Sequence, residues 1–236
     1  MGLYFDGNGG HGFLLSGGVY TNIDQPGAEE TYLYGINDKG QIVGAGTTGF
    51  LYDLASHSFT PINYPGADAS TPRSINNSGT ITGFFYFSKG SQIVYDGFTL
   101  SGSGYSRLAP LGATATYPYG ISASGELVGY AYIHSTETYL NFGFVNGKFG
   151  VLTLRYATFP LVYGINPAGS LIVGSYEPAT GITGFVYSSG NLQPLSFPGS
   201  ITTEAYGINS GETVVGYFID RSNATHGFMW TPSAGK

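Results

Sequence analysis

The strongest constraint on the fold of this chain is a short phrase that recurs five times. It reads YGINDKGQIVG at residues 34–44 and YGINSGETVVG at 206–216, with variants at 73–83, 119–129 and 163–174. The Asn position of the phrase falls at residues 37, 76, 122, 166 and 209, so the copies lie 39–46 residues apart. Self-similarity at such a period indicates a repeat architecture, in which each unit buries its apolar face against its neighbours.

Each repeat contains four short segments that are typical of β-strands. In the first copy these segments are residues 34–36, 41–44, 49–52 and 59–64, and the turn after the first of them contains Asn, Asp and Gly. Runs rich in β-branched and aromatic residues, bounded by turn residues, favour strands, and no helical period of 3.6 is present. Four strands in about 43 residues predict a blade of a β-propeller. A β-solenoid coil is usually shorter, and a β-sandwich would not repeat so regularly.

The strand count does not fix the number of blades. The first strand of the repeat occurs five times, but the Gly-Phe dipeptide of the third strand occurs six times, and the whole chain predicts 22 strands. We favour five four-stranded blades, with six as the alternative, and one domain over residues 1–236 built from about 5.5 repeats. In the five-bladed arrangement, residues 19–24 complete the sheet that contains Phe228. The ring then closes by mixing strands from both ends of the chain, with the first strand of each repeat lining the axis.

Two further elements carry a resemblance to a known family. The sequence HGF occurs at residues 11–13 and 226–228, and YTNIDQPGA occurs at 20–28. Together with the recurring phrase, these elements resemble the HAF repeat of bacterial extracellular proteins over nearly the whole chain. The resemblance implies export and a propeller-like fold, and it defines no activity. Departures are Ser122 in place of Asn in the third copy, and Arg73 and Ser74 in place of Tyr-Gly in the second.

Composition excludes several classes of partner and cofactor. Only 9% of the residues are charged, compared with about 25% in typical soluble proteins, and the net charge is −6 with no basic stripe. Nucleic acid is therefore not expected as a partner. No apolar run approaches the roughly 20 residues that cross a bilayer, so no membrane insertion is predicted, and no signal peptide precedes the repeats. The absence of Cys excludes disulfides and zinc–thiolate sites, and no cofactor motif or metal-ligand spacing of His is present.

The residue at the start of the recurring phrase is the main candidate for ligand binding. It is tyrosine in four copies and arginine in the second, and the five residues are Tyr34, Arg73, Tyr119, Tyr163 and Tyr206. If the first strands line the axis, these side chains meet at one mouth of the channel. Tyrosine rings and hydroxyls suit sugar rings, and arginine binds carboxylate or sulfate in a bidentate manner. The alternative is that the tyrosines pack between blades, and that Arg73 forms a salt bridge or makes a cation–π contact with a neighbouring tyrosine.

Other recurring residues favour structural roles. We interpret the repeated Asn as turn formers, the Phe of each Gly-Phe (residues 13, 50, 98, 144, 185 and 228) as packing residues, and His11 and His226 as makers of strand-end hydrogen bonds. His134 and Glu137 lie in a longer connection of the third copy and are secondary candidates for acid–base chemistry.

These observations support three hypotheses for function. The first is a secreted, non-catalytic propeller that binds glycans or a protein partner at the channel mouth. The second is a polysaccharide hydrolase or lyase with one asymmetric site, which needs two facing carboxylates. Its candidates are Asp68, Asp96, Glu137, Glu177, Glu204 and Asp220. The third is a structural repeat module of the cell surface, and the sequence leaves the oligomeric state open.

Overall fold

The structure is a computed structural model that describes residues 1–90, 92–110, 112–154, 157–179 and 181–232. These residues form 22 β-strands, as predicted, and one short 3₁₀ helix, η1 (His134–Thr136), with no α-helix among them. No helix in this part of the chain is long and apolar enough to cross a membrane. The prediction of an all-β fold is therefore confirmed.

The chain divides into two compact units, residues 1–118 and 119–236, and the division falls inside β12 (Ala115–Ile121). The prediction of a single domain over residues 1–236 stays a prediction. Each unit is described separately below.

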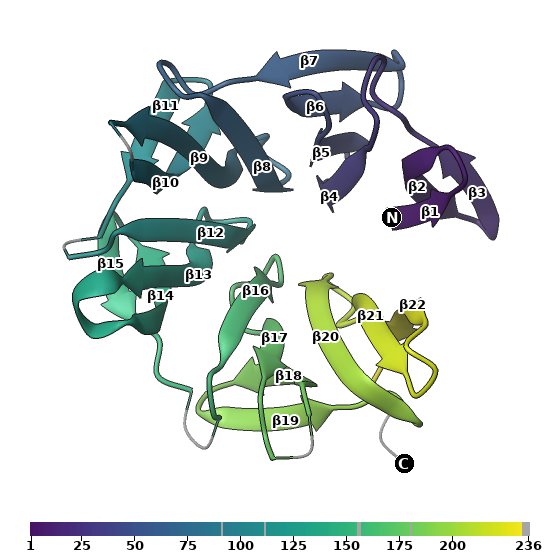
Figure 1. The fold of residues 1–236 in the computed structure, drawn as a ribbon, viewed down its shortest axis with the longest axis vertical. Helices are drawn as coiled ribbons and strands as arrows, with labels where there is room; N and C mark the ends of the chain where they lie inside the picture. Colours follow the sequence, from purple (N-terminus) through teal and green to yellow (C-terminus); the bar gives the residue numbers. More distant parts are fainter. Residues whose placement is uncertain (91, 111, 155–156, 180, 233–236) are drawn as a thin grey trace. The chain divides into compact units, whose positions relative to one another are not determined.

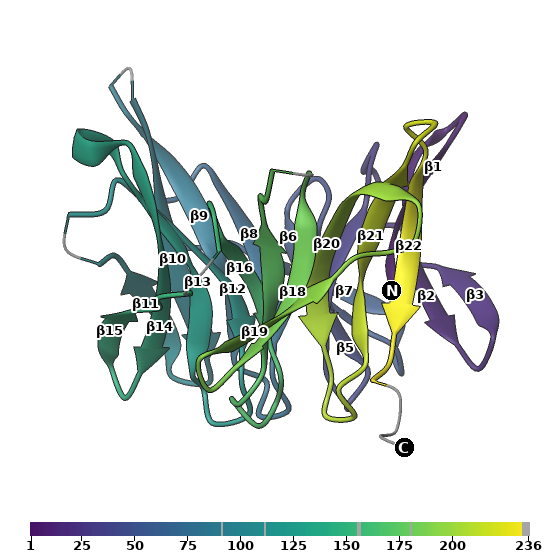
Figure 2. The same cartoon turned by 90° about the horizontal axis from the view of Figure 1, so that it is seen from below.

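The first unit contains three antiparallel strand groups that follow one another along the chain (Figure 1). Within each group the strands pair in sequence order, and β12 adds to β10 in parallel at Tyr95 and Ala115. The strands are β1 (Gly2–Asp6), β2 (Gly9–Ser16) and β3 (Val19–Asn22); β4 (Tyr32–Ile36), β5 (Gln41–Ala45), β6 (Gly49–Asp53) and β7 (Ser58–Ile62); and β8 (Ala69–Ile75), β9 (Ile81–Lys89), β10 (Gln92–Ser101) and β11 (Gly104–Leu108). Figure 2 shows β9 and β10 running side by side, and their antiparallel register extends over nine residue pairs.

The second unit repeats this arrangement. Its strands are β13 (Leu127–Ile133), β14 (Thr138–Val145) and β15 (Lys148–Val151); β16 (Leu161–Ile165), β17 (Ile172–Tyr176), β18 (Thr183–Ser188) and β19 (Asn191–Leu195); and β20 (Ser200–Ile208), β21 (Val214–Asp220) and β22 (Thr225–Trp230). Pairing is again between consecutive antiparallel strands. The described strands of the chain make five hydrogen-bonded sheets, of which one has eight strands.

The prediction for the N-terminal strand is wrong. Residues 19–24 were expected to complete the sheet of Phe228, but β3 pairs with β2, from Phe13 opposite Asn22 to Ser16 opposite Val19. Among the described strands, β22 pairs only with β21. A hairpin neighbour is close in sequence and costs little loop-closure entropy, so β3 stays with the strand that precedes it.

A contact between a glycine and a phenylalanine organises each repeat. The last Gly of the recurring phrase lies opposite the buried Phe of the next strand, as in the pairs Gly44–Phe50 and Gly174–Phe185. A Cβ added to Gly174 would lie 2.8 Å from the Phe185 ring and 2.0 Å from the Leu161 carbonyl oxygen. The glycine therefore lets the ring and a neighbouring backbone approach closely.

The same register corrects one assignment in the third repeat. Gly129 lies opposite Phe142, which is buried, whereas Phe144 lies two pairs further on, opposite Leu127, and is only half-buried. Phe142, and not the predicted Phe144, therefore occupies the packing position of this repeat. The packing role of Phe50, Phe98 and Phe185 is confirmed, because all three are completely buried.

The turn-forming role of the recurring Asn is also confirmed. The Asn37 side-chain oxygen accepts hydrogen bonds from the backbone N–H groups of Lys39 and Gln41, at 3.1 and 3.0 Å. The equivalent Asn166 accepts from Ser170 and Leu171. An Asn at this place satisfies turn donors that the strand ladder leaves unpaired.

Candidate functional site

Four of the five predicted site residues occupy β-bulges. The register between the first and second strands of a repeat shifts across Tyr34, Arg73, Tyr163 and Tyr206, so that each of them is the extra residue of its bulge. A bulge bends its strand and re-aims the extra side chain, and bulges are common beside functional sites. The repeat-equivalent position is thus special in its backbone as well as in its residue type.

In the first unit the structure brings Tyr34 and Arg73 together. The Arg73 guanidinium carbon lies 3.9 Å from the centroid of the Tyr34 ring, which is a close cation–π contact. Tyr32 stacks on Tyr34, with centroids 6.0 Å apart, and donates a short hydrogen bond to the Glu30 carboxylate. This hydrogen bond, together with burial, raises the pKa of Tyr32 to about 12. The cation–π interpretation of Arg73 is confirmed.

In the second unit the structure brings Tyr119, Tyr163 and Tyr206 together. The Tyr163 and Tyr206 rings stack with centroids 4.4 Å apart and planes 5° from parallel, and Tyr119 meets Tyr163 edge-on at 5.5 Å. Tyr163 is only 8% exposed. The strands that carry the stacked pair, β16 and β20, lie side by side (Figure 1). The packing alternative therefore holds for Tyr163, because one face of its ring is covered by Tyr206.

The glycine after Tyr163 makes this stacking possible. A Cβ on Gly164 would lie 2.7 Å from the Tyr206 carbonyl oxygen. The Tyr-Gly dipeptide of the recurring phrase therefore combines a ring that stacks with a backbone that tolerates close approach.

A buried carboxylate lies at the inner end of this cluster. Glu204 is 8% exposed, and its two oxygens accept hydrogen bonds from the Tyr206 hydroxyl at 3.1 Å and the Tyr217 hydroxyl at 2.6 Å. Burial, with a smaller contribution from the Glu204 charge, raises the pKa of Tyr217, and burial likewise raises the pKa values of Tyr163 and Tyr206. All three phenols are held in the neutral form, in which they donate hydrogen bonds.

The cluster also extends outward to the surface. Tyr119 stacks on Tyr130 at 5.4 Å, with their hydroxyls 3.3 Å apart. Tyr130 in turn meets Tyr139 edge-on at 5.8 Å, and Tyr139 is 56% exposed. We call the seven tyrosines of the second unit that contact one another the tyrosine array: Tyr119, Tyr130, Tyr132, Tyr139, Tyr163, Tyr206 and Tyr217.

Sequence reasoning missed Tyr130, Tyr139 and Tyr217 as site candidates. A signal was available for two of them, because Tyr130 and Tyr217 both follow the last Gly of the recurring phrase. That position lies on the second strand of the repeat, which pairs with the strand of the bulged tyrosine. Glu204 is one of six candidate carboxylates in the sequence, and no spacing in the sequence selects it from the others.

The secondary candidates are placed less favourably. His134 lies in η1, and Glu137 follows it in the left-handed conformation with φ 51°. Both side chains are exposed, and the two residues meet through a backbone hydrogen bond of 3.2 Å from Glu137 to His134. Acid–base chemistry at these two residues stays a prediction.

The histidines of the HGF elements make the expected strand-end contacts. His11 Nδ1 lies 2.9 Å from Asp24, and its Nε2 lies 3.3 Å from Asp6. His226 Nε2 lies 2.9 Å from Asp220. The hydrogen bond to Asp24 raises the pKa of His11. Among the described residues, no group of three or more acidic or histidine side chains is arranged to hold a metal ion.

Two of the candidate carboxylates are buried in the described part of the chain, Asp96 in the first unit and Glu204 in the second. Asp96 forms an ion pair of 2.6 Å with Arg107. Glu204 bonds to tyrosines. Each buried carboxylate thus has a defined partner of its own within its unit.

Comparison with known proteins supports the fold. No protein-family model matches the chain, and no curated protein matches it. Among solved structures, the chain is similar to the protein assigned as TolB in Agrobacterium tumefaciens, with 11% identity, a TM-score of 0.72, and coverage of 92% of this chain and 82% of the other.

Two further structures are similar at the same level of identity. The β-propeller domain of the Trilobed protease from Pyrococcus furiosus is 13% identical, with a TM-score of 0.62 and coverage of 91% and 70%. The Aleuria aurantia lectin in complex with Fucα1-6GlcNAc is 13% identical, with a TM-score of 0.57 and coverage of 97% and 86%. At such low identity the likeness concerns the fold alone. The chain has an all-β fold of the kind found in β-propeller proteins.

Proposed function

We propose that this chain is a non-catalytic saccharide-binding propeller whose ligand contacts the tyrosine array. The observation that carries the proposal is the continuity of the array from the exposed ring of Tyr139, through Tyr130 and Tyr119, to the buried pair of Tyr163 and Tyr206. An exposed aromatic ring supported from below by other rings is a rigid, flat surface with polar edges. Such a surface suits a sugar ring, which has apolar faces and a rim of hydroxyls.

Within this site the residues have different roles. Tyr139 and Tyr130 offer ring surface to the ligand, since both retain exposure. Tyr119 supports Tyr130, and Tyr163 and Tyr206 hold the base of the array in one arrangement through their stacking and the bond to Glu204. A ligand surface whose supporting groups are locked loses less conformational entropy on binding.

The pair of Arg73 and Tyr34 is the candidate contact for acidic saccharides in the first unit. The Tyr34 ring lies against the guanidinium, and the planar fork of N–H donors in arginine matches the geometry of a carboxylate or sulfate. Uronic or sulfated sugars are the ligand class that this pair supports.

The comparisons and the repeat support this function at the level of scaffold. One similar propeller is a lectin solved with a fucosylated disaccharide. We further propose that the strand groups act as blades of one propeller located outside the cell or on its surface, which agrees with the resemblance to the HAF repeat. The propeller domain of the Trilobed protease has a topology described as open velcro. This precedent supports a propeller in which the N- and C-terminal strands of the chain do not share a sheet.

The experiment that tests the function is glycan-array binding of the full chain, followed by titration of the best ligand with variants. Tyr139→Ala should weaken binding about threefold to tenfold, since an aromatic contact contributes about 0.5–1.5 kcal/mol. Tyr20→Ala is the matched control, because Tyr20 is 67% exposed and lies outside the tyrosine array. If the chain binds none of the glycans tested, or if Tyr139→Ala leaves the affinity unchanged, the result would favour a protein-binding or structural role.

The burial of the Glu204 carboxylate favours one alternative to simple saccharide binding, namely a polysaccharide-active enzyme. Glu204 is a buried carboxylate among phenols, and the equivalent positions two residues before the other phrases are Tyr32, Thr71, Tyr117 and Leu161. An enzyme should have one such asymmetric site. Release of reducing ends from a polysaccharide panel by the native chain, lost in Glu204→Gln, would support catalysis over simple binding.

A further inference from the structure

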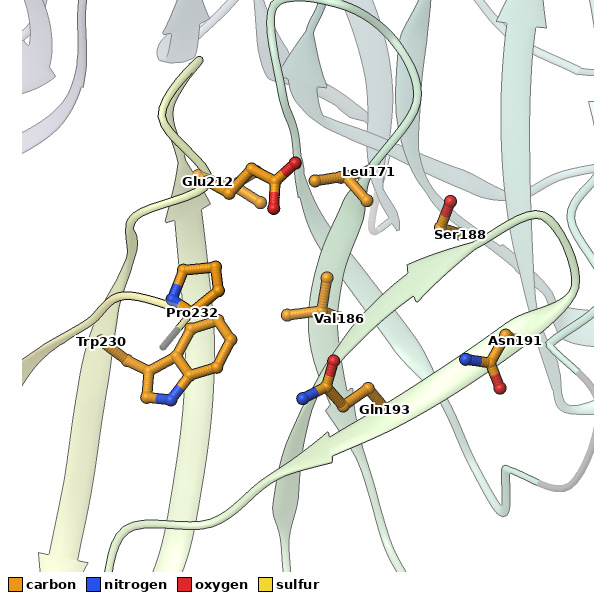
Figure 3. Close-up of a pocket in the computed structure, with 9 residues that line it drawn as sticks. Leu171, Val186, Ser188, Asn191, Gln193, Glu212, Trp230 and Pro232 are labelled. Carbon is orange, nitrogen blue, oxygen red and sulfur yellow. The ribbon is translucent and has the colours of Figure 1, made fainter. Parts of the chain in front are cut away.

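A cavity lies in the second unit, and no tyrosine of the array lines it. It has a volume of about 340 Å³ and is lined by residues of β18 and β19, the residue before β17, the end of β20, the turn before β21 and the end of β22. Figure 3 shows Trp230 and Pro232 on one side, Val186 and Gln193 on the other, and the Glu212 carboxylate at the rim. This volume is near the lower end for small-molecule pockets, roughly 300–1,000 Å³, and so suits one sugar ring better than an extended ligand.

The backbone at Glu212 breaks the pattern of the other repeats. The fourth residue of the turn after each first strand is in the left-handed conformation in all five copies, and in four of them it is a glycine: Gly40, Gly79, Gly125 and Gly169. In the fifth copy this residue is Glu212, with φ 60° and the same turn hydrogen bond, from its N–H to the Asn209 carbonyl at 3.1 Å. A side chain is disfavoured in this conformation, and such strain is found preferentially at functional sites.

The walls of the cavity combine a fixed aromatic surface with polar groups that are available to a ligand. Trp230 and Val186 both pack on the buried cluster that includes Val173 and Val214, so the apolar wall is held in place. Asn191 and Gln193 are two positions apart on β19, so their side chains lie on the same face of the strand, and both line the cavity. In the described part of the chain, the side chains of Asn191, Gln193 and Glu212 make no hydrogen bond to the protein.

From these observations we propose that the cavity is a second saccharide site, specific for a neutral sugar residue. The Trp230 ring would lie against the apolar face of the sugar, while Gln193 and Glu212 bond its hydroxyls. Carboxylates accept hydrogen bonds from sugar hydroxyls, and such charge-assisted bonds are strong. Among the described lining residues Glu212 is the only charged one, so its charge disfavours an acidic sugar. The site goes beyond the proposed function at the tyrosine array and stands independently of it.

The single tryptophan of the chain provides a direct test. The full chain is titrated with the methyl glycosides of glucose, galactose, mannose and fucose. Methyl glucuronide is titrated as well, because it differs from the glucoside only by a carboxylate at carbon 6. Emission is excited where tyrosine does not absorb, so the signal reports on the surroundings of Trp230. We expect a saturable change with at least one neutral glycoside, and binding of the glucuronide weaker by about tenfold than that of the glucoside. No saturable change with any of the four neutral glycosides would overturn the proposal.

Glu212→Gly is the decisive variant, because it installs the residue that the other four repeats carry at this place. We expect the turn and the fold to be retained while neutral-sugar affinity falls about tenfold or more, as for loss of a bond to a charged group. Glu29→Gln, at an exposed glutamate outside the cavity, is the control and should bind normally. Unchanged affinity in Glu212→Gly would overturn the proposal. Tyr139→Ala in the same titration separates the two sites, since it should leave the Trp230 signal intact.

Discussion

Tyr163 and Tyr206 stack face to face, 4.4 Å between ring centroids, although they are 43 positions apart in the sequence. Each is the bulged residue of its own strand, and Gly164, which follows Tyr163, allows the two backbones to approach. The stack therefore joins two successive repeats of the second unit through equivalent residues. Its removal should be costly, because buried aromatic rings contribute both apolar area and specific ring geometry.

Substitutions at Tyr206 should separate the two contributions. Tyr206→Phe keeps the stack and removes the hydroxyl that donates to Glu204, so we expect a loss of about 1 kcal/mol in the free energy of unfolding. Tyr206→Ala removes the ring and should cost about 3–5 kcal/mol. Urea unfolding provides the measurement, with the exposed Tyr20→Ala as a control that should stay within about 0.5 kcal/mol. Equal losses in the Phe and Ala variants would show that the stack itself contributes nothing.

The neutral phenols of the array predict a specific alkaline sensitivity. The pKa values of Tyr163, Tyr206 and Tyr217 are raised above the ordinary value of 10.0, first by burial. Their contribution to stability is complete below that value, where both folded and unfolded states are protonated. It is lost as the pH rises further, because only the unfolded chain can ionise these groups easily.

We therefore expect the free energy of unfolding to fall steeply above about pH 10. The double variant Tyr163→Phe/Tyr206→Phe should show a shallower decline over the same range. An identical slope in the double variant and the native chain would contradict the assignment of the effect to these two residues.

The glycine opposite the buried Phe predicts a sharp contrast between two glycines of the second unit. Gly174→Ala would place a methyl group 2.0 Å from the Leu161 carbonyl oxygen and should cost at least about 1–3 kcal/mol. Gly150→Ala lies on β15, with no atom within 4 Å of the added methyl group. It should be nearly neutral. Thermal or urea unfolding of both variants gives the comparison, and similar stabilities would mean that the close approach is not required.

Arg73 gives a prediction about ligand charge. Arg73→Ala should weaken binding of a uronic or sulfated glycan by about 1–3 kcal/mol, the scale for losing a hydrogen bond to a charged group. Binding of a neutral glycan should change little, and Arg73→Lys should retain part of the affinity. Calorimetric titration with acidic and neutral forms of the same oligosaccharide measures the difference. A variant that loses both ligands together with its cooperative unfolding would show that Arg73 acts through the fold.

Much of the fold could be predicted because the repeat supplies independent copies of the same information. The strand count, the Asn-based turns and the packing of Phe50 and Phe98 all follow from short-range chemistry at fixed positions. The pairing of β3 could not be predicted, because strand counts are equally consistent with either arrangement of the chain ends. In the third repeat the register, which depends on backbone pairing, decides between Phe142 and Phe144.

The candidate site was predicted only in part, for related reasons. The bulged position could be predicted because its residue type recurs from repeat to repeat. The role of Glu204 could not, because the equivalent residues of the other repeats are not acidic, and only the fold places its carboxylate beside two phenols. The strained Glu212 is visible in the sequence as a missing glycine, since the fifth phrase reads NSGET where the first reads NDKGQ. Its meaning depends on the neighbouring Trp230, which the fold places at the same cavity.

The bulges at Tyr34, Arg73, Tyr163 and Tyr206 have a consequence for how such a chain can change over evolution. A bulged residue adds no pair to the ladder, so its identity does not set the register of either strand. Tyrosine could be exchanged for arginine in the second repeat while the flanking residues kept their pairing. Each of these four repeats thus carries one position where the side chain can vary without a change of strand register. Duplication of the repeat would multiply such positions, and a new specificity could arise one copy at a time.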